Sequence, residues 1–100
     1  MIKSFRDREA ELIFHRCRSR KLPNELQRVA LRKLLQIDAA TLLETLRVPP
    51  GNRLEGLAGD RKGQHAIRVN HQWRICFLWR EGDAYEVEIV DYHRAKRGAG

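Results

Sequence analysis

The chain has 100 residues, with 20 lysines and arginines against 13 aspartates and glutamates, a formal charge of +7 and a pI of about 10.1. Such a surface favours polyanions, chiefly nucleic acid, or an acidic protein partner. Hydrophobic residues make up 42% of the chain, which argues against a disordered basic tail, and no apolar run approaches the roughly 18 residues of a membrane span.

Helical periodicity fills the first half of the chain, after a possible short strand over residues 1–5. Asp7 is placed to cap a first helix, and Asn24, followed by Gln27, predicts a capping box at the start of a second. A further capping box, Thr41 with Glu44, predicts a short third helix that ends before two prolines. The first helix has an apolar stripe of Ala10, Ile13, Phe14 and Cys17, and the second buries Leu26, Val29, Ala30, Leu34 and Ile37, leaving Arg28, Arg32 and Lys33 towards solvent.

After Gly51 the hydrophobic period changes from 3.6 to 2, which predicts strands. They are expected over residues 54–57, 65–69, 73–80 and 85–90, separated by turns at 59–63, 70–72 and 81–83. Helices followed by consecutive strands indicate an α+β fold, with N-terminal helices packed on one face of a small antiparallel β-sheet. We expect one domain over residues 1–93, followed by a basic flexible tail over residues 94–100.

Alternation along the strands assigns side chains to the two faces of this sheet. Arg68 and Arg74 lie opposite to the predicted core face and form a phosphate-sized pair on neighbouring strands. Solvated arginines, or arginines paired with Glu86 and Glu88, would give the same pattern. The predicted core face carries Ile67, Val69, Trp73, Ile75, Phe77 and Trp79, with Tyr85, Val87 and Ile89 sharing a face of the last strand.

The cysteines and histidines give no sign of a metal centre. Cys17 falls on the apolar stripe and is expected to pack, whereas Cys76 lies on the Arg74 face and is expected to be accessible. Two cysteines make no disulfide framework and no CxxC pair. Without an apolar signal region at the start of the chain, we expect a reduced, cytoplasmic setting, no metal or other cofactor, and no membrane partner.

The predicted sheet ends in Asp91, Tyr92 and His93. An aspartate and a histidine can exchange protons with a substrate, and a tyrosine can stack on a base or donate a hydrogen bond. Polar residues at a strand end are common, so this tripeptide alone identifies no activity.

Six short segments occur in an order that resembles the HigB toxins of bacterial toxin–antitoxin systems, within the RelE/ParE superfamily. They are MIKSF at 1–5, IDAAT at 37–41, NRLE at 52–55 followed by Leu57, GDRKG at 59–63, IRVN at 67–70 with WRI at 73–75, and DYH at 91–93. The resemblance covers residues 1–93. It implies a RelE-like α+β fold and a metal-independent mRNA interferase that cuts mRNA on the ribosome.

The resemblance also implies partners. A HigA-type antitoxin with a helix-turn-helix domain would neutralise the toxin, and operator DNA would be contacted only through the antitoxin complex. The ribosome and mRNA would be the targets.

Functional residues carry over by position. Arg74 matches the arginine that stabilises charge on the scissile phosphate, and Asp91, Tyr92 and His93 match the group that lines the active site and helps transfer protons. RNA-binding positions are expected at Arg53, Arg61, Lys62 and Arg68.

One departure concerns the general base. Some HigB toxins carry a histidine and a lysine where this chain has Glu55 and Ala58. Glu55 or His93 could act as the base, or the activity could be slow. Two other functions therefore stay open: a basic growth inhibitor that binds RNA or the ribosome without cleavage, and a ParE-like gyrase inhibitor.

Overall fold

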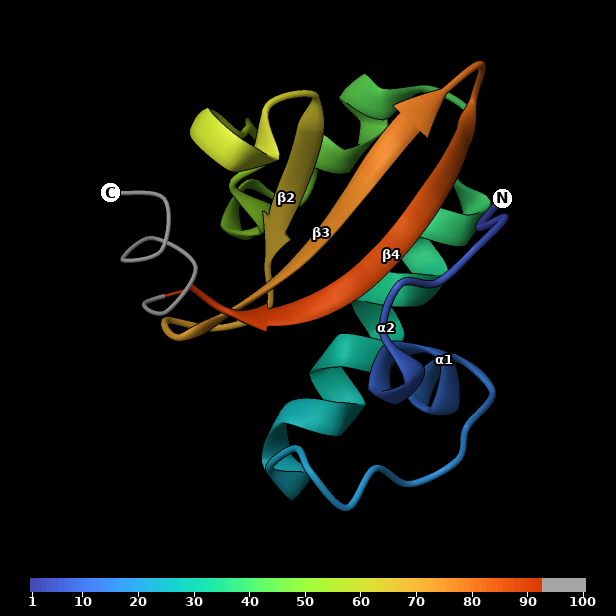
Figure 1. Cartoon of the computed structure of the whole chain (residues 1–100), viewed down its shortest axis with the longest axis vertical. Coiled ribbons are helices and arrows are strands. Elements are labelled where there is room, and N and C mark those ends of the chain that lie inside the picture. Colours follow the sequence, from blue (N-terminus) through green and yellow to red (C-terminus); the bar gives the residue numbers. More distant parts are fainter. Residues whose placement is uncertain (93–100) are drawn as a thin grey trace.

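A computed structural model describes residues 1–92, which form two α-helices and one four-stranded antiparallel sheet (Figure 1). The order across the sheet is β1-β2-β3-β4, and the α+β prediction is confirmed. His93 and the predicted tail over residues 94–100 lie outside the described residues. The elements are α1 (Arg8–Phe14), α2 (Asn24–Ala39), β1 (Glu55–Gly56), β2 (Gln64–Arg68), β3 (Trp73–Arg80) and β4 (Asp83–Asp91), with 3-10 turns η1 (Leu43–Arg47), η2 (Pro50–Asn52) and η3 (Gly59–Arg61).

The first residues run along the outer edge of β4. Instead of a continuous strand, they form two isolated parallel bridges, Ile2 with Ala84 and Phe5 with Val87. The backbone N–H of Lys3 donates to the Ala84 carbonyl at 2.7 Å. This segment therefore satisfies an edge of the sheet that would otherwise be open to pairing with another chain.

Asp7 caps α1 as predicted, and its carboxylate also binds the sheet. Oδ1 accepts the N–H of Glu9 at 2.9 Å, and Oδ2 accepts the N–H of Ile89 at 3.2 Å. The helix ends at Phe14 because the chain turns through a left-handed Arg16, with φ 63°. The predicted stripe therefore stops early, and Cys17 is exposed rather than packed.

The predicted cap of α2 is wrong. Pro23 occupies the N-cap position without a side-chain hydrogen bond, and Asn24 is already helical. Gln27 instead fastens the preceding loop: its Nε2 donates to the carbonyls of Ser19 and Leu22 at 2.8 and 2.9 Å. The predicted capping box at Thr41 is also absent, and η1 begins at Leu43 without a side-chain cap.

A buried polar cluster joins α2 to the connection before the sheet. Lys33, predicted to face solvent, is 6% exposed and donates from Nζ to Oδ1 of Asn52, which is fully buried. Asn52 Nδ2 in turn donates to the carbonyls of Leu46 and Val48 at 3.0 and 3.3 Å and to Gln36 Oε1 at 3.2 Å. Burial lowers the pKa of Lys33. Because both residues are polar, the period-3.6 pattern could not identify this contact.

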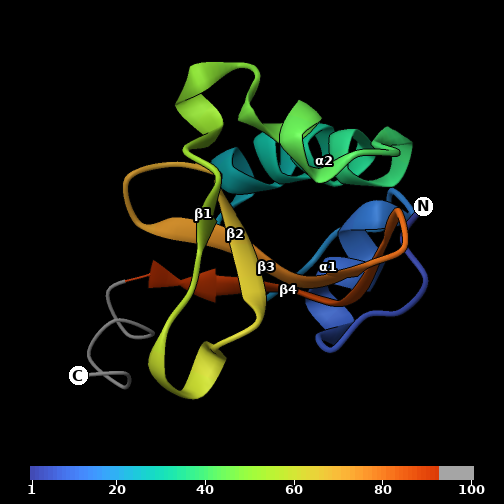
Figure 2. The same cartoon turned by 90° about the horizontal axis from the view of Figure 1, so that it is seen from above.

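The helices pack on one face of the sheet, and the connection between β1 and β2 extends past the other (Figure 2). The core between helices and sheet includes the predicted residues Leu26, Ala30, Leu34 and Ile37 of α2, and Ile67, Ile75, Phe77, Val87 and Ile89 of the strands. Within residues 1–92, no helix has the length and apolar character needed to cross a bilayer.

A β-bulge changes the face assignment of β4. Cys76 pairs with Glu88, but Leu78 pairs with Tyr85, so β4 contains one extra residue between the two pairs. Glu86 lies there with a left-handed φ of 53°. The bulge shifts the alternation by one residue, so that Ala84 is buried in the core and Tyr85, predicted to share the Val87 face, is not.

We expect Asn52→Ala to lower the free energy of unfolding by about 2–4 kcal/mol, because it leaves the Lys33 ammonium and two backbone carbonyls without their partner. Asn24→Ala, at an exposed position of α2, is the control and should change stability by no more than about 0.5 kcal/mol. Urea unfolding followed by circular dichroism measures both. Equal effects of the two substitutions would contradict the structural role of Asn52.

Candidate functional site

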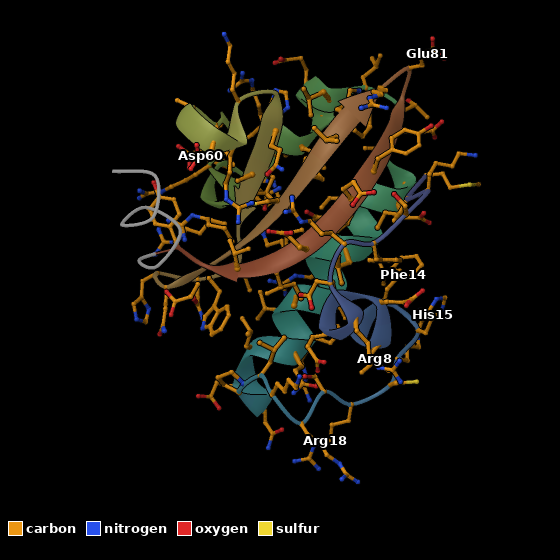
Figure 3. All side chains as sticks on the ribbon, viewed as in Figure 1. Arg8, Phe14, His15, Arg18, Asp60 and Glu81 are labelled. Atoms are coloured by element: carbon orange, nitrogen blue, oxygen red, sulfur yellow. The ribbon has the colours of Figure 1, made fainter. Side chains whose placement is uncertain are left out.

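Arg68 and Arg74 lie side by side on the sheet face that the helices leave uncovered, as predicted. Arg68 pairs with Arg74 across β2 and β3, and Arg74 pairs with Val90 on β4. Their neighbours Ile67 and Ile75 are buried on the opposite, helical face. In Figure 3, Glu81 marks the β3–β4 turn at one end of the sheet. The arginine pair belongs to the other end, where β3 begins and β4 finishes.

Contacts on two sides fix the guanidinium of Arg74. Its Cζ lies 4.1 Å from the centroid of the Tyr92 ring, a cation–π distance. Its Nη1 donates to the carbonyl oxygens of Asn70 and Trp73 at 2.7 and 3.1 Å. Among residues 1–92, Nε and Nη2 have no hydrogen-bond acceptor. The side chain is half-buried, so it presents these two donors from a fixed position.

Charged neighbours surround Arg74. Burial lowers its pKa, the positive charges of Arg68 and Arg53 lower it further, and Tyr92 and Glu55 raise it. An arginine remains protonated in spite of such shifts. Two further guanidiniums and one carboxylate therefore lie within electrostatic range of a permanent cation, which is a suitable setting for a phosphodiester.

Glu55 reaches this face from the edge strand β1. It pairs with Ala66, which lies two residues before Arg68 on β2 and therefore has its side chain on the same face. The carboxylate is exposed, and no ion pair holds it within the described chain. Its negative charge acts on Arg74, whose pKa it raises.

Asp91 does not share this face. It pairs with Trp73, and its Oδ2 accepts from Gln72 Nε2 at 3.0 Å. The backbone N–H of Tyr92 donates to the Gln72 carbonyl at 2.6 Å. Asp91 thus ties the end of β4 to the β2–β3 turn. The side chain of the next residue, Tyr92, lies on the Arg74 side of the sheet. The structure brings Arg74 and Tyr92 together, and His93 lies beyond the described residues.

The remaining basic positions differ in their partners. Arg53 and Lys62 are exposed, and Arg53 has a left-handed φ of 47° directly after the buried Asn52. Arg61 instead forms an ion pair with Glu88, at 2.9 Å. Strand alternation offers Glu88 as a partner of Arg68 or Arg74; its pairing with Arg61 does not follow from alternation, because η3 is not part of a strand.

The Cys76 thiol is buried, contrary to the expectation of an accessible cysteine. It is 2% exposed, and burial raises its pKa to about 11. At neutral pH the group is therefore a thiol and not a nucleophilic thiolate. Among residues 1–92, no group of three or more histidine, cysteine, aspartate or glutamate side chains is placed to hold a metal ion.

Comparison with known proteins identifies relatives over almost the whole chain. A family model described as the RelE-like toxin of type II toxin–antitoxin system HigB matches residues 3–93. Toxin HigB-1 of Vibrio cholerae is 43% identical over 77 residues, which cover 77% of this chain and 80% of that protein. Endoribonuclease HigB of Proteus vulgaris is 37% identical over 94 residues, covering 93% of this chain and 100% of the relative.

Solved structures agree on the fold. YafQ from E. coli superposes with a TM-score of 0.58 at 11% identity, over 95% of this chain and 96% of that chain. At this identity the likeness concerns the arrangement of helices and sheet, and the family assignment rests on the sequence matches.

The two cysteines should differ in reactivity. We expect Cys17, exposed in the loop after α1, to react with a thiol reagent such as DTNB at neutral pH. Cys76 should react only after unfolding, because it is both buried and protonated. Counting the thiols that react with DTNB before and after addition of guanidinium chloride tests this, and a Cys17→Ser variant identifies the thiol that reacts fast. Rapid reaction of two thiols in the folded protein would contradict the placement of Cys76.

Proposed function

Because the chain belongs to the HigB-like family of RelE toxins from type II toxin–antitoxin systems, we propose that it inhibits translation as a metal-independent endoribonuclease. The observation that carries the proposal is the Arg74 guanidinium, which is held against Tyr92 on the open sheet face and whose Nε and Nη2 have no acceptor within residues 1–92. A cleavage site for RNA needs such a fixed cation where negative charge develops.

The reaction uses the 2′-hydroxyl of the substrate as the nucleophile. A base removes the proton of this hydroxyl, the 2′-oxygen attacks phosphorus, and the bond to the 5′-oxygen breaks. An acid returns a proton to that leaving oxygen. The products are a 2′,3′-cyclic phosphate and a 5′-hydroxyl, and the protein supplies a base, an acid and a cation.

In this scheme Arg74 binds the non-bridging oxygens of the scissile phosphate through Nε and Nη2. Its Nη1 is already held by two carbonyls, and Tyr92 supports the plane of the guanidinium. The donors are thus oriented before the substrate arrives, so little reorganisation accompanies the gain of charge in the transition state.

Glu55 is the base in our proposal. Its exposed carboxylate lies on the Arg74 face, within electrostatic range of that cation, whereas Asp91 is bound to Gln72 on the other side. His93 follows Tyr92 directly in the sequence, and we assign it the return of the proton to the 5′-oxygen. Asp91 would orient the end of β4.

Family membership implies an antitoxin partner, since these toxins belong to two-protein systems. We propose that this partner is a HigA-type protein with a helix-turn-helix domain, through which operator DNA is contacted. The substrate would be mRNA on the ribosome, in the cytoplasm, and ribosomal positioning would supplement the small catalytic group. The net charge of +7 and the exposed Arg53 and Lys62 support contact with RNA phosphates.

We expect Arg74→Gln to lower kcat roughly 10²–10³-fold, because it removes the cation that stabilises the transition state. Arg74→Lys should recover only part of the loss, since lysine keeps the charge but not the planar fork. Primer extension on mRNA in a purified translation system measures the appearance of new 5′ ends.

The matched control is Arg80→Gln, at the other end of β3, where the guanidinium also lies over a tyrosine, 5.7 Å from the Tyr85 ring. This variant should cleave as the wild type does. Growth arrest by the wild type without new 5′ ends would refute cleavage and support the alternative of an inhibitor that only binds RNA or the ribosome.

Glu55→Gln should lower kcat about 10²-fold or more with little change in KM, because a general base contributes roughly 10²–10⁴-fold. Glu81→Gln, an equal change of charge in the β3–β4 turn, serves as the control. Single-turnover cleavage by the wild type and the two variants measures this difference. Wild-type rates from the Glu55 variant would transfer the role of base to His93.

A further inference from the structure

Glu88 is a buried carboxylate on the same sheet face as Arg74. Val90, two residues further along β4, pairs with Arg74. Glu88 and Arg74 therefore lie in neighbouring cross-strand rows, the row through Cys76 and the row through Arg74. The Glu88 side chain is 10% exposed, and both of its oxygens are bound: Arg61 Nη1 lies 2.9 Å from Oε1, and Arg6 Nε lies 3.3 Å from Oε2. A carboxylate is costly to bury unless it is paired in this way.

The two arginines that bind Glu88 come from different segments. Arg6 belongs to the segment along the outer edge of β4, and its side chain is 59% exposed. Arg61 ends η3, in the connection between β1 and β2; it is 27% exposed, and Nη1 also donates to Gln64 Oε1 at 3.0 Å. Because exposed ion pairs contribute little, the contact with Arg61 is the stronger one.

Arg61 reaches Glu88 across the middle of the sheet. Between η3 and β4, strands β2 and β3 place the small side chains Ala66 and Cys76 on this face, both buried. These small residues leave room for a guanidinium to cross. Cys76 pairs with Glu88, and Arg74 pairs with Val90 two residues along each strand, so the guanidinium that binds Glu88 lies one cross-strand row away from Arg74.

We infer that Glu88 is a positioning residue: it holds Arg61 so that the remaining N–H groups of this guanidinium bind the RNA backbone next to the phosphate bound by Arg74. The inference rests on the function proposed above. A long side chain loses rotamer freedom when it binds a ligand. With Nη1 fixed by Glu88 and Gln64, part of this loss has already occurred in the free protein, which strengthens binding.

Glu88→Gln tests the inference because it removes the charge and keeps the shape. We expect KM for mRNA-programmed ribosomes to rise roughly 10-fold while kcat stays within about twofold, the pattern of a lost binding contact outside the reacting atoms. Glu86→Gln, an exposed position on the same strand, makes the same change of charge and should leave both constants unaltered. A purely stabilising Glu88 would change the unfolding midpoint and leave KM at the wild-type value.

A double-mutant cycle separates action through Arg61 from an independent effect. Arg61→Gln should raise KM at least as much as Glu88→Gln, and the double variant should show no rise beyond that of Arg61→Gln. Two effects that multiply, or a wild-type KM in the Glu88 variant, would overturn the inference.

Arg61→Lys keeps a positive charge beside Glu88, so it remains informative if the Glu88 variant does not fold. It should also weaken binding, because lysine cannot share the two acceptors and bind phosphate with a planar fork; unchanged affinity would count against the inference. Affinity is measured with an mRNA that carries a 2′-deoxynucleotide at the cleaved position. This readout needs no cleavage. A wild type that fails to cut RNA would therefore refute the proposed function and leave the inference about Glu88 to be decided by the affinities.

Discussion

The alternation of side chains along β3 is the constraint on which the rest of the molecule depends. Ile75 and Phe77 point to the helices and are fully buried, and Arg74 and Cys76 point to the other face. A slip of one residue would exchange the two sets and bury a guanidinium beneath α2. The burial of two large apolar side chains therefore fixes, on the opposite side of the same strand, the location of the cation at the site.

The β2–β3 turn converts this placement into a rigid geometry. Oδ1 of Asn70 accepts the backbone N–H groups of Gln72 and Trp73, both at 2.9 Å, which shapes the turn. The carbonyl of the same asparagine binds Arg74, and the side chain of Gln72 binds Asp91. One short turn thus holds the guanidinium and the end of β4 from which Tyr92 projects, so these parts of the site keep their separation.

The sequence predicts the elements and the two sheet faces because both follow from local periodicity. Some failures are local, such as the cap of α2, which begins after Pro23 rather than after Asn24, whereas others depend on contacts between distant segments. Lys33 resembles a solvent-facing lysine until Asn52, 19 residues later, provides its partner. The bulge at Glu86 shifts the alternation that placed Tyr85 on the same face as Val87. Arg74 and Tyr92 are separated by 18 positions, and only their resemblance to family positions joined them before the structure did.

Charge pairing divides the open face into two parts that the net charge of +7 does not reveal. In the row through Cys76, Glu88 forms ion pairs with arginines from two other segments and ties them to β4. In the row through Arg74, Arg68 and Arg74 have no ion-pair partner within residues 1–92, and their mutual repulsion is one reason that the pKa of Arg74 is lowered. Like charges on neighbouring strands repel each other, and in the proposed function an anionic phosphate bound between them would relieve that repulsion.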